Sequence, residues 1–211
     1  MLGLPLPNFP ELIARVVTLV AALSFHEFAH AWVANRLGDD TPRLHGRLTL
    51  NPLAHLDPLG AIMLLVAGFG WAKPVPINPY TLRRRTPAGV MLVSAAGPFS
   101  NLLLAILAAL PFRFGLINFA TSTFITNFLW YFLILNLILF FFNLIPLFPL
   151  DGEKVLTYFL PPSLQESFIR LRPIAPVILM ALLFVGPALN LPIFTWLVGM
   201  PAEKLAFLLA F

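Results

Sequence analysis

Long apolar segments constrain this chain more than any other feature of its sequence. A helix needs about 20 apolar residues to cross a bilayer, and segments of about that length lie at 10–37, 87–111, 122–143, 173–190 and 192–211. Only 10% of the residues are charged and 59% are hydrophobic, whereas about a quarter of a soluble domain is charged. The sequence therefore predicts an all-α polytopic membrane protein with about five to six transmembrane helices.

A shorter apolar segment at 58–72 is expected to behave differently. It has about 15 residues and several glycines, which makes it too short to span as a helix. Arginines flank it, one group within 36–47 and another at 83–85. Because positive residues collect on the cytoplasmic side of membrane proteins, both groups are expected on one face. We therefore predict a re-entrant segment at 58–72, a cytoplasmic face for both arginine groups, and an external N-terminus.

The remaining composition excludes several classes of protein. The formal charge is +4, but the basic residues are few and lie beside apolar segments, where the positive-inside bias explains them without any nucleic-acid partner. The absence of cysteine excludes a disulfide framework and thiolate chemistry. The N-terminus lacks the basic region and cleavage site of a signal peptide, so the first apolar segment is expected to remain a helix. A single membrane-embedded domain over 1–211 is expected.

Three ionisable residues interrupt the first apolar segment: His26, Glu27 and His30, in the stretch SFHEFAHAW. The histidines stand four residues apart, so on a helix they share one face and can ligate one zinc ion. Glu27 is turned away from that face but can reach a water beside the metal, as the general base does in H-E-x-x-H zinc peptidases. A chance match would arise in roughly two chains per thousand of this composition. Ionisable groups inside a membrane are also costly, which favours a functional site.

A catalytic zinc site needs a third protein ligand. His45 and His55 lie near the histidine pair, but the stronger candidate is Asp151 in NLIPLFPLDGEKV, residues 143–155, where prolines break the preceding helix and Gly152 permits an abrupt turn. If the helix at 122–143 returns to the face on which the first helix ends, Asp151 can meet the histidines. Taken alone, Asp151 is better explained as the N-cap of the following helix.

The two end motifs together resemble those of the site-2 protease family of intramembrane zinc metalloproteases. These motifs are HEFAH at 26–30 and NLIPLFPLDG at 143–152, and between them GRLTLNPLAHLDPLG, GWAKPVPINP and AAGPFSN are similar to the compact branch of bacteria and archaea. The resemblance covers about residues 20–155 in the family's order and leaves C-terminal helices at 173–211. It implies a multi-pass protein of a prokaryotic cell membrane, without the PDZ or CBS modules of larger relatives.

The resemblance also implies a role for each matching residue. His26, His30 and Asp151 match the ligands of a Zn²⁺ cofactor, and Glu27 matches the catalytic base. Asn143 matches an asparagine near the scissile bond, where its amide could bind a substrate carbonyl or stabilise the oxyanion. A helix–helix hydrogen bond is the open alternative for Asn143.

Residues between the end motifs carry weaker signals. Gly97 and Asn101 match a G-x-x-x-N element of the family and are interpreted as mainly structural, through close helix packing. For His55 and Asp57, both a supporting role at the site and an ordinary loop contact stay open. The alternating stretch GRLTLN at 46–51 predicts a short β-strand. Its edge could take an unwound substrate by β-addition, although an ordinary loop is the open alternative.

The predicted activity is that of a zinc-dependent intramembrane endopeptidase acting on transmembrane segments of other proteins within the lipid bilayer. The substrate helix must unwind locally, because helical carbonyls are hydrogen-bonded and shielded. Glu27 would take a proton from the attacking water and pass it to the leaving amine, at a site open to the cytoplasmic side. The alternatives are a membrane metal transporter or a non-catalytic zinc-binding scaffold. A transporter would need polar residues along a continuous path, and a scaffold would be expected to have lost Glu27 or a ligand.

Overall fold

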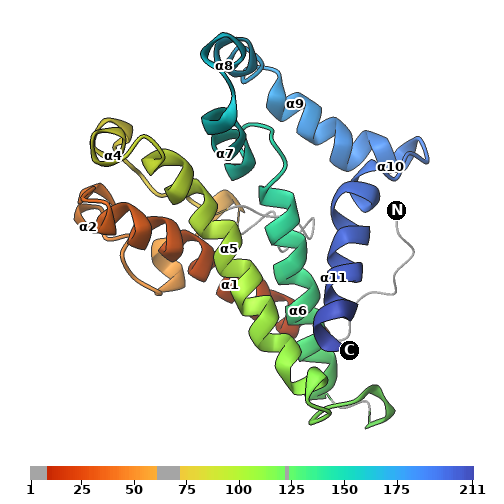
Figure 1. Cartoon of the computed structure of the whole chain (residues 1–211). Coiled ribbons are helices and arrows are strands. Elements are labelled where there is room, and N and C mark those ends of the chain that lie inside the picture. Colours follow the sequence, from red (N-terminus) through yellow and green to blue (C-terminus); the bar gives the residue numbers. More distant parts are fainter. Residues whose placement is uncertain (1–8, 61–71, 122–123) are drawn as a thin grey trace.

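The computed structural model describes residues 9–60, 72–121 and 124–211 of the chain. The described chain is mostly helical (Figure 1). Three helices are long and apolar enough to cross a membrane: α1 (Phe9–Arg36), α5 (Gly89–Arg113) and α6 (Phe124–Asn143). Each coincides with an apolar segment of the sequence, so the prediction of an all-α membrane protein is confirmed.

Shorter helices connect and follow these three. Between α1 and α5 lie α2 (Thr41–Leu44), a 3₁₀ turn (Pro52–Ala54) and α4 (Pro79–Arg85), and a second 3₁₀ turn (Phe119–Thr121) precedes α6. After α6 come α7 (Asp151–Phe159), α8 (Pro162–Ile169), α9 (Ala175–Met180), α10 (Gly186–Ala188) and α11 (Met200–Ala210). Two π-helical stretches, Ala181–Val185 and Thr195–Gly199, join α9 to α10 and lead into α11.

The predicted count of five to six spans is not confirmed. Only the three long helices reach spanning length in the described ranges, and the apolar segments at 173–190 and 192–211 form shorter helical units. Asn190 has a left-handed backbone (φ 56°) and ends the first of these units, as asparagine commonly does after a helix. The predicted re-entrant segment at 58–72 falls mostly on 61–71, outside the described residues.

Helix α5 lies at the centre of the bundle, with α1 along one side and α6 along the other (Figure 1). Helix α11 packs against both α5 and α6 at the end distant from α4. Alanines of α5 and α11 pack against leucines of α6 in this contact. Such small residues allow helices to approach closely. The buried members of the contact include Ala105, Ala108 and Ala109 of α5, Leu133 and Leu137 of α6, and Ala202, Ala206 and Ala210 of α11.

The C-terminal end of α1 packs beside the start of α5. Ala34 of α1, Leu82 of α4 and Val93 of α5 form one buried cluster there. The chain therefore leaves α1 and enters α5 at the same end of this helix pair. The arginines at 36 and at 83–85 lie at that common end, as the sequence predicts.

The predicted β-strand at 46–51 is wrong, because these residues form bends and turns. Side chains of this region bond nearby backbone carbonyls instead of leaving them for a strand partner. The buried Arg47 donates to the carbonyls of Ala54 (2.6 Å) and Lys73 (3.2 Å), and His55 donates to Thr49 O (2.7 Å). The β-pairing within the described residues is one isolated antiparallel bridge, between Leu56 and Ala72.

Candidate active site

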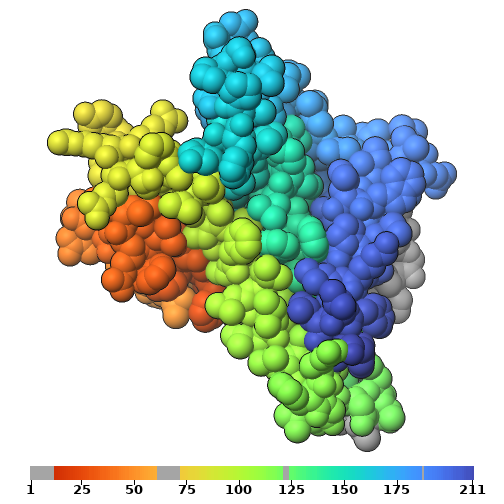
Figure 2. Space-filling view, in the orientation of Figure 1, coloured from red at the N-terminus to blue at the C-terminus, as the bar shows by residue number. Residues whose placement is uncertain are grey.

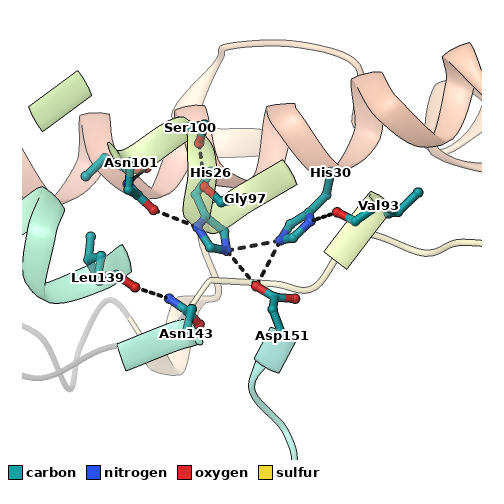
Figure 3. Close-up of polar contacts among 10 residues, drawn as sticks. His26, His30, Val93, Gly97, Ser100, Asn101, Leu139, Asn143 and Asp151 are labelled. Carbon is teal, nitrogen blue, oxygen red and sulfur yellow. Dashed lines mark hydrogen bonds and ion pairs between the residues drawn. The ribbon is translucent and has the colours of Figure 1, made fainter. Parts of the chain in front are cut away.

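His26, His30 and Asp151 converge from two helices (Figure 3). The four-residue spacing places both histidines on one face of α1, and Asp151 opens α7 after α6 has returned along α5. The two Nε2 atoms are 3.0 Å apart, and Asp151 Oδ2 lies 3.1 Å from that of His26 and 3.2 Å from that of His30. The structure thus brings together the three predicted ligands, although Asp151 lies 121 positions after His30 in the sequence.

The three donor atoms fit a zinc ion. Two donors that are about 2.0–2.1 Å from a tetrahedral zinc lie about 3.3 Å from each other, which is close to the 3.0–3.2 Å found here. Two imidazole nitrogens and one carboxylate oxygen also form the donor set of a catalytic zinc site, which keeps its fourth position for water.

Gly97 on α5 keeps space in front of the two rings (Figure 3). A Cβ atom at this position would lie 2.6 Å from His26 Nε2 and even closer to His30 Nε2. The sequence suggests helix packing as the role of this glycine, but its missing side chain opens the space into which the ligands point.

In both histidines, Nδ1, the ring nitrogen that points away from Asp151, forms a hydrogen bond with an oxygen atom. His26 Nδ1 donates to Asn101 Oδ1 and His30 Nδ1 donates to the carbonyl of Val93, both at 2.7 Å. Because each Nδ1 carries the hydrogen, each Nε2 keeps its lone pair for a metal ion. Asn101 is therefore more than the packing residue that the sequence suggests. The sequence contains a signal for this role: Asn101 is an amide in a strongly apolar helix and shares a helix face with Gly97, four residues earlier.

Asp151 is oriented by the turn that precedes it. Gly152, the next residue, approaches the end of α6 so closely that a Cβ atom would lie 2.5 Å from Ile145 O, so glycine is needed there for space and not for the abrupt turn expected from the sequence. Asp151 is the first residue of α7 rather than its N-cap, so the capping alternative is wrong. Burial alone would raise the pKa of Asp151, but the adjacent His30 and His26 outweigh burial and hold that pKa below its ordinary value.

A cavity of about 460 Å³ opens beside the ligands and is walled by α1, α5, α6, α7, α9 and the extended stretch after Ala72. In the space-filling view, α4 and the α7–α8 region stand apart as separate projections (Figure 2). Glu27 lines the cavity, is 8% exposed, and has no hydrogen-bond or ion-pair partner among the described residues. The other lining side chains are mostly apolar, including Leu23, Val93, Leu139, Phe142, Pro176 and Leu179.

Asn143 lies at the end of α6 and lines the same cavity (Figure 3). Its Nδ2 donates to Leu139 O one turn back in α6, at 3.0 Å. This bond lies within a single helix and is not the helix–helix bond that was the alternative.

The other sequence candidates lie outside the ligand group. His45 is exposed and contacts Thr41 O at 2.8 Å, so it is not a third ligand. His55 bonds the carbonyl of Thr49, and Asp57 accepts from the backbone of Leu59 and Gly60. His55 and Asp57 therefore organise their own loop, as the loop alternative suggests.

Comparisons with known proteins agree on one family. The model of Peptidase family M50 matches residues 113–186, which include Asp151. The "Putative zinc metalloprotease YwhC" of Bacillus subtilis is 44% identical over 188 residues, which cover 87% of this chain and 84% of that protein. The "Putative zinc metalloprotease Rip2" of Mycobacterium tuberculosis is 36% identical over 196 residues, which cover 88% of this chain and 72% of that protein.

No solved structure gives a significant match. The names of these relatives and the donor set agree on zinc as the cofactor. The chain belongs to peptidase family M50, the family of site-2 proteases.

Proposed function

We propose that the protein is a zinc-dependent intramembrane endopeptidase that cleaves transmembrane segments of other membrane proteins. One observation carries this proposal: a zinc-type donor group lies among membrane-length helices, beside a cavity with mostly apolar walls. A soluble polar peptide would lose its hydration in such a cavity without compensation. An apolar segment that has locally unwound would bury its side chains there.

Five polar residues that line the cavity have a proposed task. His26, His30 and Asp151 hold zinc, which when bound polarises a peptide carbonyl and lowers the pKa of a water molecule. Glu27 accepts a proton from the attacking water and returns it to the amine of the leaving peptide. Its free carboxylate beside the ligand pair supports this role. Asn143 contacts the substrate carbonyl near the bond that is cleaved.

The site is proposed to open toward the cytoplasm. Arg36 and the arginines at 83–85 lie at one end of the α1–α5 pair, and Asp151 follows the end of α6 that returns there. The positive-inside rule assigns such an end to the cytoplasm. The re-entrant path of 58–72, the larger number of spans and the single-domain organisation remain part of this proposal.

The test uses purified protein with two kinds of fluorogenic peptide, one from a single-span transmembrane segment and one from a soluble loop. Mass spectrometry of the fragments should locate cleavage within the apolar segment only, and a zinc chelator should abolish it. Cleavage of the loop peptide alone would contradict the intramembrane assignment. Metal flux into liposomes without cleavage would support the transporter alternative instead.

A further inference from the structure

Two fully buried asparagines lie behind the His26 ligand, one on α5 and one on α6. Asn101 and Asn136 both have 0% exposure, although their helices are otherwise strongly apolar. A primary amide in such surroundings costs free energy unless its donors and acceptor are paired. The arrangement of their partners is therefore informative.

The hydrogen bonds run in one direction from α6 to the ligand. Asn136 Nδ2 donates to Phe132 O in its own helix (2.9 Å), which leaves Asn136 Oδ1 facing α5. Asn101 Nδ2 donates to that oxygen (3.0 Å) and to Ala22 O on α1 (3.2 Å). Asn101 Oδ1 is then the atom that accepts from His26 Nδ1. Each amide is thus oriented by the group before it.

The orientation of the Asn101 amide decides which nitrogen of His26 carries the hydrogen. If the amide turned over, its NH₂ group would face His26 Nδ1, which would then have to accept a hydrogen bond. The ring hydrogen would sit on Nε2, the atom that faces His30 and Asp151. A protonated Nε2 has no lone pair for a metal ion.

We propose that Asn136 is a positioning residue of the metal centre, which sets the tautomer of His26 through the amide of Asn101. Asn136 lies on a different helix from both histidines, and its hydrogen bonds go to Asn101 and Phe132 rather than to either of them. This inference rests on the proposed assignment of His26 as a zinc ligand. It extends that assignment to a residue that neither end motif contains.

The test measures zinc affinity by competition with a chromophoric chelator, together with the melting temperature of the metal-free protein. Asn136→Leu, which keeps the volume but removes the carbonyl, should weaken zinc binding about tenfold or more, as loss of outer-shell support does elsewhere. Asn136→Asp, protonated in these apolar surroundings, donates its hydroxyl to Phe132 O, keeps its carbonyl oxygen toward Asn101, and should keep near-wild-type affinity. The control is Leu133→Ala, a buried site in the same helix, which should lower melting but leave zinc affinity unchanged.

A second-site variant separates positioning from packing. In Asn101→Asp, a carboxylate presents an oxygen to His26 in either orientation, so the tautomer of His26 no longer depends on Asn136. Adding Asn101→Asp to Asn136→Leu should therefore recover zinc affinity, whereas a packing defect would persist. If Asn136→Leu does not fold, Asn136→Ala takes its place in the same comparison.

Two results would overturn the inference. One is unchanged zinc affinity in a folded Asn136→Leu or Asn136→Ala protein. The other is equal loss in the leucine and aspartate variants, with no recovery by Asn101→Asp. Absence of stoichiometric zinc from the wild-type protein, measured first, would instead overturn the proposed metal centre and this inference with it.

Discussion

At the scale of single residues, the proposed metal centre depends as much on an absent side chain as on the three proposed ligands. Gly97 is the residue of α5 that faces both Nε2 atoms. Neither imidazole can yield this space, because Asn101 holds the His26 ring and the carbonyl of Val93 holds the His30 ring. The residue at position 97 is therefore expected to control metal binding directly.

Gly97→Ala should abolish zinc binding while the protein stays folded. Alanine is the better helix former by about 1 kcal/mol, so loss of metal would not reflect unfolding of α5. The measurement is zinc content after purification, with Gly199→Ala as the control, since a Cβ there would make only an ordinary contact of 3.6 Å with Thr195. Full zinc occupancy in the Gly97→Ala protein would show that the ligands point elsewhere.

The histidine pair of the proposed ligand group was predictable from the sequence because its spacing has a direct chemical meaning. Two histidines one helical turn apart share a face on any helix. Asp151 could be assigned to the same site as the histidines only from the family resemblance and from the assumption that the 122–143 helix returns to the face on which the first helix ends. Asn101 could be noticed as an amide in an apolar helix, but neither its bond to His26 nor that of Val93 to His30 could be assigned, because the partner of an Nδ1 atom depends on the rotation of α5 against α1. Asn136 gives no spacing signal at all.

At the scale of helices, one ion pair connects the ligand helix to the wall of the cavity. Glu153 is two residues after Asp151 and only 2% exposed. Arg172, in the turns before α9, donates to its Oε1 from Nε (2.9 Å) and Nη2 (2.7 Å). Because α9 contributes Pro176 and Leu179 to the cavity wall, this pair fixes the wall relative to Asp151.

Arg172→Leu should destabilise the protein by about 2 kcal/mol, because it leaves a buried carboxylate without its cation. This is less than the ~3–5 kcal/mol for a fully buried pair, since the Arg172 side chain is 42% exposed. The measurement is chemical denaturation in detergent. The control is Arg170→Leu, whose pair with Glu166 is exposed on both sides and should contribute little.

Adding Glu153→Gln should recover part of the stability lost in Arg172→Leu, because the uncompensated charge is then removed. Equal destabilisation by Arg172→Leu and Arg170→Leu would show that the Arg172–Glu153 pair stabilises the protein no more than the exposed Arg170–Glu166 pair does.

The helices themselves were predictable where apolar length determines them, as in α1, α5 and α6. The strand expected at 46–51 was not formed, since alternation alone cannot reveal that Arg47 and His55 bond the nearby carbonyls. The C-terminal apolar segments divide into shorter units, where π-helical stretches and the left-handed Asn190 interrupt regular α-helix.

At the scale of the whole molecule, the packing of α1 against α5 makes a prediction about topology. The chain leaves α1 and enters α5 at the same end, so Thr41 and Thr86 lie at that end. The loop after α5, which includes the exposed Leu116, lies at the other end.

Single cysteines at Thr41 and Thr86 should react with a membrane-impermeant thiol reagent from the same side, and a cysteine at Leu116 from the opposite side. The absence of native cysteine makes every signal unambiguous. The measurement compares labelling of intact cells with that of inverted vesicles, and the cytoplasmic proposal requires Thr41→Cys and Thr86→Cys to react only in the vesicles. Labelling of these two from opposite sides would refute the common end.

The central claim is that this membrane helix bundle performs hydrolysis at its metal centre, and Glu27 is the residue that distinguishes hydrolysis from metal binding alone. Glu27→Gln keeps the size of the side chain and removes its ability to accept a proton. A matched control is Glu203→Gln, at an exposed position of α11 far along the chain.

The most direct measurement is cleavage of a transmembrane substrate by Glu27→Gln, with zinc content and melting temperature recorded on the same preparation. A general base contributes about 10²–10⁴ in rate, so cleavage should fall by at least that order while zinc content and melting stay at wild-type values. Glu203→Gln should be indistinguishable from wild type. Near-wild-type cleavage by a zinc-loaded Glu27→Gln protein would contradict the account, because the proton would then be taken by another group.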